Sequence, residues 1–270
     1  MALILIIFSP TLHIELKANP ASGRSFVETF ETGDLSRWFI SNGWTNGAHQ
    51  GCTWREKNIA AGGGALELIL RKDVQQPAAG LDPWKLYSCA ELRTHEPLGY
   101  GTYEVRMQPA AGPGLVSAFF TYIGPQPDAP SPHDEIDFEF LGKDPTTVQL
   151  NYFGNGQGHH ETMVKLPFDA FETMADYAFE WLPGGIRWFV NGRLVHEVKR
   201  EEGKPFPVTP SRIYLSLWSG NGLDAWTGTF AYPDRPLTAR YERVAFTRAG
   251  DPCQFPESVV CTAGAREQAK

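Results

Sequence analysis

The sequence predicts an all-β protein, an antiparallel two-sheet β-sandwich of the jelly-roll type. Short runs rich in β-branched and aromatic residues recur between clusters of Gly, Pro, Asn and Asp, which is the pattern of strands joined by turns. No helical periodicity persists beyond a turn or two, and no alternation of strands with helices indicates a parallel sheet. No repeat of about 20 to 50 residues indicates a solenoid or propeller. Two packed antiparallel sheets are therefore the expected architecture.

The strands are assigned in chain order from these runs. They are residues 65–71, 102–107, 115–122, 134–141, 147–153 and 212–218. The clearest hairpin joins residues 186–190 to residues 193–198 through Asn191 and Gly192. Asn-Gly supplies the two positive φ values of a type I′ turn. A Pro-Gly-Gly run at residues 183–185 predicts a second turn just before this hairpin.

The chain length limits the number of domains, and the net charge limits the classes of partner. A chain of 270 residues is long enough for one sizeable core, and all-β domains of this length are often single. We expect one domain at residues 25–250, preceded by a signal or flexible segment (1–24) and followed by a tail with a local disulfide (251–270). The net charge of −7 and the absence of any Lys/Arg run argue against nucleic-acid and anionic-membrane partners. We expect a monomer.

The N-terminus resembles an atypical or truncated secretory signal. An apolar stretch runs from Ala2 to Phe8, and small residues follow at Ala18 and Ala21, where a signal peptidase could cut. The stretch lacks a basic region before it and is too short to span a bilayer. The expectation is a secreted protein, extracellular or periplasmic.

The four cysteines fit an exported protein. Four cysteines allow three pairings, and no CxxC motif indicates a metal or redox site. Cys52 and Cys89 flank an early strand, whereas Cys253 and Cys261 lie close together near the C-terminus. We favour the pairs Cys52 with Cys89 and Cys253 with Cys261. The alternative is free buried thiols in a cytosolic protein.

Residues 134–141 carry the most informative pattern, in which acidic and apolar side chains alternate. Successive side chains of a strand point to opposite faces, so three carboxyl groups line one face and three apolar side chains enter the core. The two sets are Glu135, Asp137 and Glu139, and Ile136, Phe138 and Phe140. Crowded carboxylates raise the pKa of at least one of them, which places a protonated acid beside an ionised partner. A glycosidase needs such a pair.

The spacing of this pair predicts a concave sheet. Along a flat strand the Cα atoms of Glu135 and Glu139 lie roughly 13 Å apart, at about 3.3 Å per residue. Retaining glycosidases need carboxyl groups about 5 to 5.5 Å apart and inverting ones about 6.5 to 9.5 Å. Side chains that lean together over a concave sheet reach the retaining distance. On the pattern alone, a solvated strand face and a Ca²⁺ site of oxygen ligands are the alternatives.

The flanking sequence resembles a known family. The stretches are GCTWRE, GTYEVRM, SAFFTYIGP, HDEIDFEFLGKD, VQLNYF, LPFDAFETMADYAFEW and LSLWSGNGLDAW. Together they resemble the bacterial lichenases, the endo-1,3-1,4-β-glucanases of glycoside hydrolase family 16, in order from about Ser25 to Thr247. Rhizobial endo-glycanases that trim acidic exopolysaccharide share the acidic motif. Plant xyloglucan transglycosylases share HDEIDFEFLG but resemble the remainder less.

The resemblance implies a concanavalin A-like jelly roll with a concave substrate cleft, and a role for each acid. Glu135 matches the nucleophile, Asp137 the assisting acid and Glu139 the general acid/base of a double displacement. The spacing alone permits the reverse assignment of the two glutamates, and only the resemblance decides it. The implied reaction is hydrolysis of β-1,4 bonds in mixed-linkage β-1,3-1,4-glucan, without a catalytic cofactor. Cys52 and Cys89 match the family's disulfide.

Further positions match the family's cleft. They are Trp44, Asn46, Glu91, Arg93, Phe120, Tyr122, Asn151, Phe153 and Trp218. Aromatic rings stack on sugar faces, and the polar groups bind hydroxyls. At three positions the chain departs from the lichenases, with His133 in place of Trp, Ser216 in place of Asn, and Phe153 where Tyr is common. The motif that contains His133 favours a glycan other than pure cereal-type glucan. Phe120 alone is equally consistent with the core.

The resemblance also implies a structural Ca²⁺ on the convex side, near Thr29, Gly64 and Glu242, with Glu in place of the family's Asp. Three other functions compete with lichenan hydrolysis. They are cleavage of a succinoglycan-type exopolysaccharide or another β-glucan, transglycosylation, and non-catalytic sugar binding by a lectin-like module. A lectin has no use for an acid/base pair on the cleft floor, which favours the enzyme.

Overall fold

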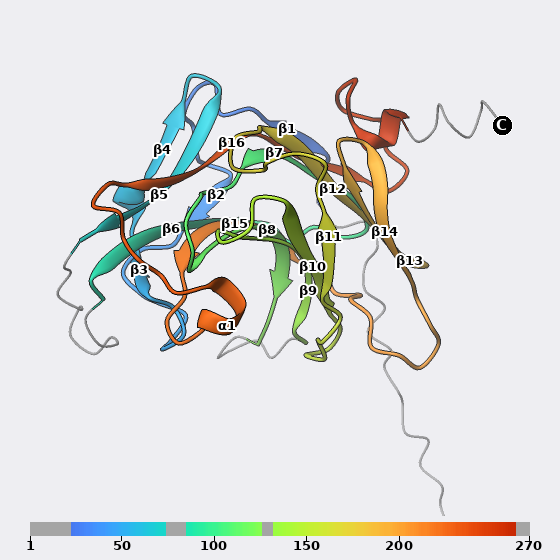
Figure 1. Cartoon of the computed structure of the whole chain (residues 1–270). Coiled ribbons are helices and arrows are strands. Elements are labelled where there is room, and N and C mark those ends of the chain that lie inside the picture. The colour runs from blue at the N-terminus through green and yellow to red at the C-terminus, as the bar shows by residue number, and fades with distance from the viewer. Residues whose placement is uncertain (1–22, 74–84, 126–131, 263–270) are drawn as a thin grey trace, which may run out of the picture.

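The computed structural model describes residues 23–73, 85–125 and 132–262 (Figure 1). The expected signal features, from Ala2 to Ala21, lie outside the described residues. Within the described ranges no helix is long and apolar enough to cross a membrane.

One layer of the fold, here called the cleft sheet, carries the acidic strand. Its strands pair in the order β11 (Thr162–Lys165), β10 (Thr147–Phe153), β9 (Asp134–Leu141), β8 (Leu115–Ile123), β15 (Arg212–Ser219) and β6 (Tyr87–Thr94). The short strand β2 (Trp38–Ile40) pairs with β6. All these pairs are antiparallel, as the sequence predicts.

The second layer, here called the outer sheet, packs against the first (Figure 1). Its order is β14 (Arg193–Lys199), β13 (Gly185–Val190), β12 (Ala175–Leu182), β7 (Gly101–Gln108), β16 (Leu237–Arg248), β5 (Ala65–Lys72) and β4 (Ile59–Gly62). β1 (Phe26–Glu28) pairs with β16. The layers meet along one edge, where the end of β5 pairs with the start of β6. Short helical segments include one α-helical turn, α1 (Asp224–Thr227), and one 3-10 turn, η1 (Glu56–Asn58).

One strand pair departs from the antiparallel expectation. β3 (Cys52–Trp54) runs parallel to β6, with Cys52 opposite Tyr87 and Trp54 opposite Cys89. The Cys52–Cys89 disulfide ties this short strand to β6. The expected pairing of these two cysteines is therefore present.

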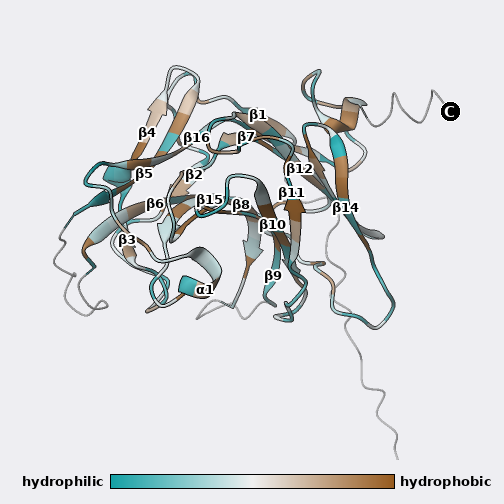
Figure 2. Ribbon diagram, in the orientation of Figure 1, coloured by the Kyte–Doolittle hydropathy of each residue, from teal (hydrophilic) through white to brown (hydrophobic). Residues whose placement is uncertain are grey.

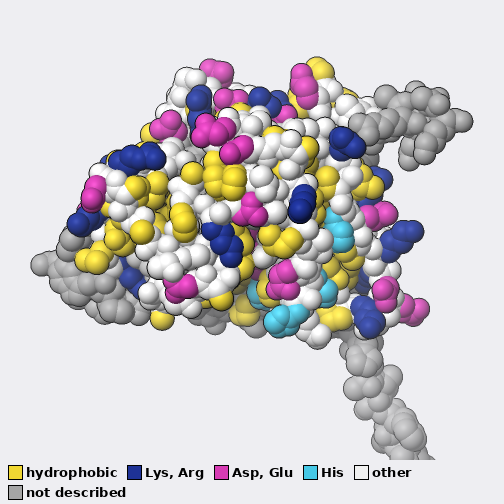
Figure 3. All heavy atoms as spheres, viewed as in Figure 1, with side chains coloured by type: hydrophobic (Ala, Val, Ile, Leu, Met, Phe, Trp, Pro, Cys, Tyr) yellow, Lys and Arg dark blue, Asp and Glu magenta, His cyan; other side chains and the backbone are white. Residues whose placement is uncertain are grey.

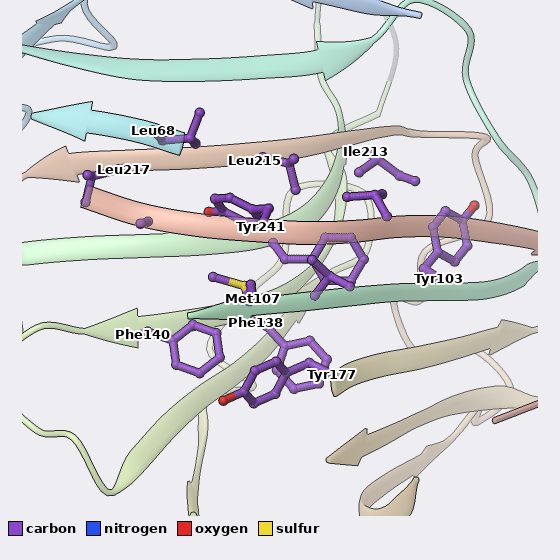
Figure 4. Close-up of a cluster of buried hydrophobic side chains, with 14 of the residues drawn as sticks. Leu68, Tyr103, Met107, Phe138, Phe140, Tyr177, Ile213, Leu215, Leu217 and Tyr241 are labelled. Carbon is purple, nitrogen blue, oxygen red and sulfur yellow. The ribbon is translucent and has the colours of Figure 1, made fainter. Parts of the chain in front are cut away.

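The core lies between the two sheets (Figure 4). The outer sheet contributes Met107, Tyr177 and Tyr241, and the cleft sheet contributes Phe138 and Phe140, all of them buried. Polar and apolar residues alternate along the strands, which separates the core face from the solvent face (Figure 2). The expected inward orientation of the apolar residues of β9 is confirmed.

The hairpin of β13 and β14 has the expected turn. Asn191 and Gly192 adopt φ values of 46° and 71°, as a type I′ turn requires. A register irregularity lies between Trp188 and Phe189, a feature that the sequence pattern did not indicate.

The segment after β16 is anchored to the outer sheet. Cys253 and Cys261 form the second disulfide, as expected. The Ser258 hydroxyl and the Val259 N–H both donate to the buried Glu104 carboxylate on β7, over 2.7 and 2.9 Å. The described part of the expected tail is thus held on the face of β7 that points away from the core.

Candidate active site

Three carboxyl groups of β9 line a cavity of about 730 Å³ over the cleft sheet. They belong to Glu135, Asp137 and Glu139, which alternate with the buried apolar residues of the same strand. The strand period therefore places all three acids on the cleft side. A carbohydrate chain needs an open groove of this kind, lined by polar groups and rings.

Each acid of β9 belongs to a row of cross-strand neighbours that the antiparallel register defines across the sheet. The first row runs Phe153, Glu135, Tyr122, Arg212. The second runs Asn151, Asp137, Phe120, Tyr214, Arg93. The third runs Gln149, Glu139, Ala118, Ser216, Glu91. Directly opposite residues share a face, so residues far apart in the sequence become neighbours in the cleft.

Glu139 has the environment of a proton donor. Its Oε2 accepts a hydrogen bond of 2.8 Å from Nε2 of Gln149, and Gln149 in turn accepts one of 2.9 Å from the Trp226 indole. Burial, followed by the negative charge of Glu135, raises the pKa of Glu139 to about 8. Glu139 is therefore mainly protonated at neutral pH.

Asp137 lies between the two glutamates and is almost fully buried. Burial, followed by the charges of Glu135 and Glu139, raises its pKa well above the usual range. A hydrogen bond joins it to Glu135 and acts in the same direction. Asp137 is thus a neutral donor to the Glu135 carboxylate.

Glu135 is paired with the imidazole ring that precedes the strand. Nε2 of His133 lies 2.5 Å from Oε2 of Glu135. The His133 ring stacks on Phe153 and meets Tyr122 edge-on. The hydrogen bond with Glu135 raises the pKa of His133 more than burial lowers it. The three acids of one strand therefore have three different environments.

Nine of the expected binding residues line the cavity with the acids. They are Trp44, Asn46, Glu91, Arg93, Phe120, Tyr122, His133, Ser216 and Trp218. Phe120 is half-buried and stacks on Tyr214, with 4.9 Å between ring centroids, so it belongs to the cleft.

Asn151 and Phe153, the other two expected binding residues, are outside the cavity lining. The Asn151 side-chain oxygen accepts the backbone N–H of His160, and the Phe153 ring supports His133. Both side chains therefore position neighbouring groups.

Several lining residues were not expected from the sequence. They are Phe39, Ser41, His49, Gln50, Trp54, Ala118, Arg212 and Tyr214. Arg212 and Tyr214 share the period-two face of Ser216 and Trp218, so strand alternation could have found them. Phe39 lies on a strand of three residues, which carries no recognisable period.

Glu91, on β6, is a further buried carboxyl group in the cleft. The Ser41 hydroxyl donates to it over 2.6 Å. Burial raises the pKa of Glu91 to about 7, although Ser41 and the charge of Arg93 act in the opposite direction. At neutral pH Glu91 can therefore both donate and accept hydrogen bonds to sugar hydroxyls.

Glu242, the side chain expected near a calcium ion, is already paired with cations. Glu242 lies between two guanidinium groups, 3.1 Å from Nε of Arg106 and 3.6 Å from Nη2 of Arg240. These cations occupy both carboxylate oxygens that a calcium ion would need. In the described parts of the chain, no group of three or more His, Cys, Asp or Glu side chains is arranged to hold a metal. The pairing of Glu242 with arginines disfavours calcium at that carboxylate, and the calcium site near Thr29 and Gly64 stays a prediction.

Comparison with known proteins places this cleft in a family. Residues 46–234 match glycosyl hydrolases family 16. The chain is 46% identical over 239 residues to the endo-1,3-1,4-beta-glycanase ExoK of Rhizobium meliloti, covering 88% of this chain and 84% of that protein. It is 39% identical over 249 residues to a beta-glucanase of Bacillus subtilis, covering 92% and 96%.

The chain belongs to glycosyl hydrolase family 16. A crystal structure of a prokaryotic beta-1,3-1,4-glucanase (lichenase) from a mouse hindgut metagenome superimposes on this family 16 enzyme with a TM-score of 0.73 and 44% identity, covering 83% of this chain and 99% of that one. The expected resemblance and the all-β sandwich are thereby confirmed. The protein is a glycoside hydrolase with a polysaccharide substrate.

Proposed function

We propose that this enzyme is a retaining endo-β-glycanase that hydrolyses β-1,4 bonds in mixed-linkage β-1,3-1,4-glucan. The observation that carries the proposal is the unequal environment of two glutamates on one strand face. Burial raises the pKa of Glu139 to about 8, whereas Glu135 lies 2.5 Å from Nε2 of His133, whose pKa this contact raises. Glu139 therefore holds a proton at neutral pH, and Glu135 is the carboxyl group left for the role of nucleophile.

In the first step Glu139 donates its proton to the glycosidic oxygen, and a Glu135 carboxylate oxygen attacks the anomeric carbon. The bond from the anomeric carbon to the leaving oxygen breaks, the leaving sugar departs as an alcohol, and a glycosyl ester forms on Glu135. Asp137 donates a hydrogen bond to Glu135 and disperses its charge as the ester later breaks.

In the second step Glu139, now a carboxylate, removes a proton from water. The water oxygen bonds to the anomeric carbon, the ester bond breaks, and Glu135 leaves as a carboxylate. Glu139 is again protonated, so the cycle closes with no net proton change on the enzyme. Two inversions at one carbon give retention of configuration.

The cleft and the relatives support a β-glucan substrate. Rings at Trp44, Phe120, Tyr214 and Trp218 line the groove, and aromatic rings stack on the apolar faces of glucosyl units. The two relatives named above are an endo-1,3-1,4-beta-glycanase and a beta-glucanase.

A second candidate is a polysaccharide that carries acidic groups, such as a succinoglycan-type exopolysaccharide. Arg93 and Arg212 line the same cleft, and the positive charge of Arg93 contributes to lowering the pKa of Arg212 after burial. Their described polar contacts are to backbone carbonyls, those of Thr94 and His95. Two neighbouring guanidinium groups favour a carboxylate on the glycan.

Export fits the two disulfides, because disulfides persist in oxidising compartments. We propose that residues 25–250 form the catalytic domain of a monomeric exported enzyme, with residues 1–24 as its signal or leader. Size-exclusion chromatography with light scattering and N-terminal sequencing of the exported protein test these two points.

The test of the reaction is a substrate panel scored by reducing ends and by the linkage of the products. It contains lichenan, barley glucan, laminarin, xyloglucan, agar, carrageenan and a succinoglycan-type polymer. We expect cleavage of the two mixed-linkage glucans at β-1,4 bonds. Preference for the succinoglycan-type polymer would favour the second candidate, and oligosaccharide products longer than the starting chains would favour transglycosylation.

Variants distinguish an enzyme from a lectin. Glu135→Gln and Glu139→Gln should each lose turnover by about 10² to 10⁴-fold or more while the fold stays intact. The matched control is Glu202→Gln, because Glu202 is exposed and distant from β9 in the sequence. Binding without cleavage of any polymer in the panel would favour the lectin.

A further inference from the structure

His133 makes a short contact to the nucleophile proposed above. It comes two residues before Glu135, and its Nε2 lies 2.5 Å from the Oε2 atom of that carboxylate. Charge-assisted hydrogen bonds have heavy-atom distances at the short end of the normal range. One carboxylate oxygen of Glu135 is therefore held by the ring.

The His133 ring is itself fixed by the two strands that flank β9. It stacks on Phe153 of β10 with 4.6 Å between centroids and an interplanar angle of 14°. It meets Tyr122 of β8 edge-on, at 5.1 Å and 65°. Phe153 and Tyr122 are the direct cross-strand neighbours of Glu135, so the ring sits over the same row of the sheet. The N–H of Gly156 fixes the His133 backbone carbonyl over 2.7 Å.

The charges around the ring favour its protonated form. Glu135 faces it from β9, Asp134 adds a second negative charge, and the Tyr122 hydroxyphenyl group faces it from β8. Phe153, on the remaining side, carries no charge. Asp134 accepts backbone N–H groups of Asn155, Val208 and Thr209, so its carboxylate stays in place.

We propose that His133 is a positioning residue for the nucleophile, which holds and orients the Glu135 carboxylate. The inference rests on the proposed function, in which Glu135 attacks the sugar. A bond to Oε2 restricts rotation of the carboxylate, and a pre-oriented nucleophile lowers the entropic cost of attack.

The first test is independent of any substrate. The His133 ring is titrated by NMR in the full-length free enzyme, and the His133→Gln spectrum identifies its signal. We expect a midpoint above the ordinary histidine value, and a lower midpoint in Glu135→Gln, because the amide carries no charge. A midpoint at or below the ordinary value, or one unchanged by Glu135→Gln, would overturn the proposal. Neither result depends on which glycan the enzyme cuts.

The second test measures kcat and KM against pH on mixed-linkage glucan. His133→Gln keeps a hydrogen-bond donor and loses the charge, whereas His133→Phe keeps the ring and loses the hydrogen bond. In His133→Gln, which keeps the donor, kcat should fall less than in His133→Phe. In His133→Phe we expect kcat to fall about 10-fold or more, with KM changed less than about twofold.

His196→Gln is the matched control, because His196 lies on β14 in the outer sheet and should leave the profile unchanged. A rise in KM for both His133 variants with kcat and both pH limbs unchanged would show that His133 only contacts sugar, and would overturn the inference. Absence of cleavage by the wild type would contradict the proposed function instead, and the NMR titration would still decide the role of the ring.

Discussion

Glu139 and Gln149 are direct cross-strand neighbours, and the Gln149 amide donates a hydrogen bond of 2.8 Å to Oε2 of the Glu139 carboxyl group. This contact favours the ionised form of Glu139, whereas burial and the charge of Glu135 favour the protonated form. Burial has the larger effect, so the pKa stays raised to about 8. The balance of these effects therefore sets the highest pH at which Glu139 remains a protonated general acid.

Replacement of Gln149 should extend activity to higher pH. Gln149→Met removes the amide donor and keeps a side chain of similar length, so the pKa of Glu139 should rise further. We expect the alkaline limb of kcat/KM, near pH 8 in the wild type, to move up by about half a unit or more. A pH series on mixed-linkage glucan measures it, with Gln254→Met, in the exposed segment after β16, as control. A limb that stays in place or moves down would contradict the account.

Glu139→Gln should stabilise the fold at alkaline pH. The folded pKa of about 8 lies above the ordinary 4.5, so the folded protein holds the proton more tightly than the unfolded chain does. The stability that this group contributes is complete below about pH 4.5 and is lost as the pH rises through about 8. Glutamine carries no charge at any pH.

Thermal unfolding of wild type and Glu139→Gln across pH 4 to about pH 9 measures this difference. The two melting temperatures should be close at pH 4, and the variant should have the higher value at pH 9. If the difference in melting temperature between wild type and variant were the same at every pH, Glu139 would carry no buried charge in the folded protein.

The segment after β16 should contribute to stability without affecting catalysis. Ser258→Ala removes one of the two donors to the buried Glu104 carboxylate. Loss of a partner for a buried group costs about 1 to 3 kcal/mol. We expect a lower melting temperature and unchanged kcat, because Glu104 lies outside the cleft. Ser36→Ala, at an exposed serine, is the control, and an equal melting temperature for the two variants would contradict the anchoring role.

Calcium should not stabilise the protein through Glu242. Arg106 and Arg240 already neutralise that carboxylate. Enzyme treated with chelator and then supplied with calcium should therefore show no rise in melting temperature. A ligand present at about 100 times its Kd would add about 2.7 kcal/mol. A rise of that size that saturates with calcium and disappears in Glu242→Gln would show that the ion displaces the arginines.

The alternation along one strand was enough to predict which face the acids share. Ile136 and Phe138 are too apolar for the surface, so Glu135, Asp137 and Glu139 had to face the other way. Gln149 was predictable in principle, since it shares the period-two face of Asn151 and Phe153. It was missed because an amide carries no catalytic signature by itself.

The rows across the sheet could not be read from the sequence. Placing Arg212 in the row of Glu135 requires the register of β9 on β8 and of β8 on β15, which joins segments far apart in the chain. Local patterns set strand faces, whereas tertiary packing sets partners and register. The parallel pairing of β3 with β6 was missed for the same reason, because three residues define no direction.

The central claim is that Glu135 and Glu139 act by double displacement. The anomeric configuration of the first products, followed by NMR, tests this claim most directly. Wild-type enzyme is added to mixed-linkage glucan in D₂O, and the new reducing-end anomeric protons are followed before mutarotation. The account predicts that the β-anomer appears first and the α-anomer grows later. Initial release of the α-anomer would mean a single displacement with inversion, and would contradict the assignment of Glu135 as the nucleophile.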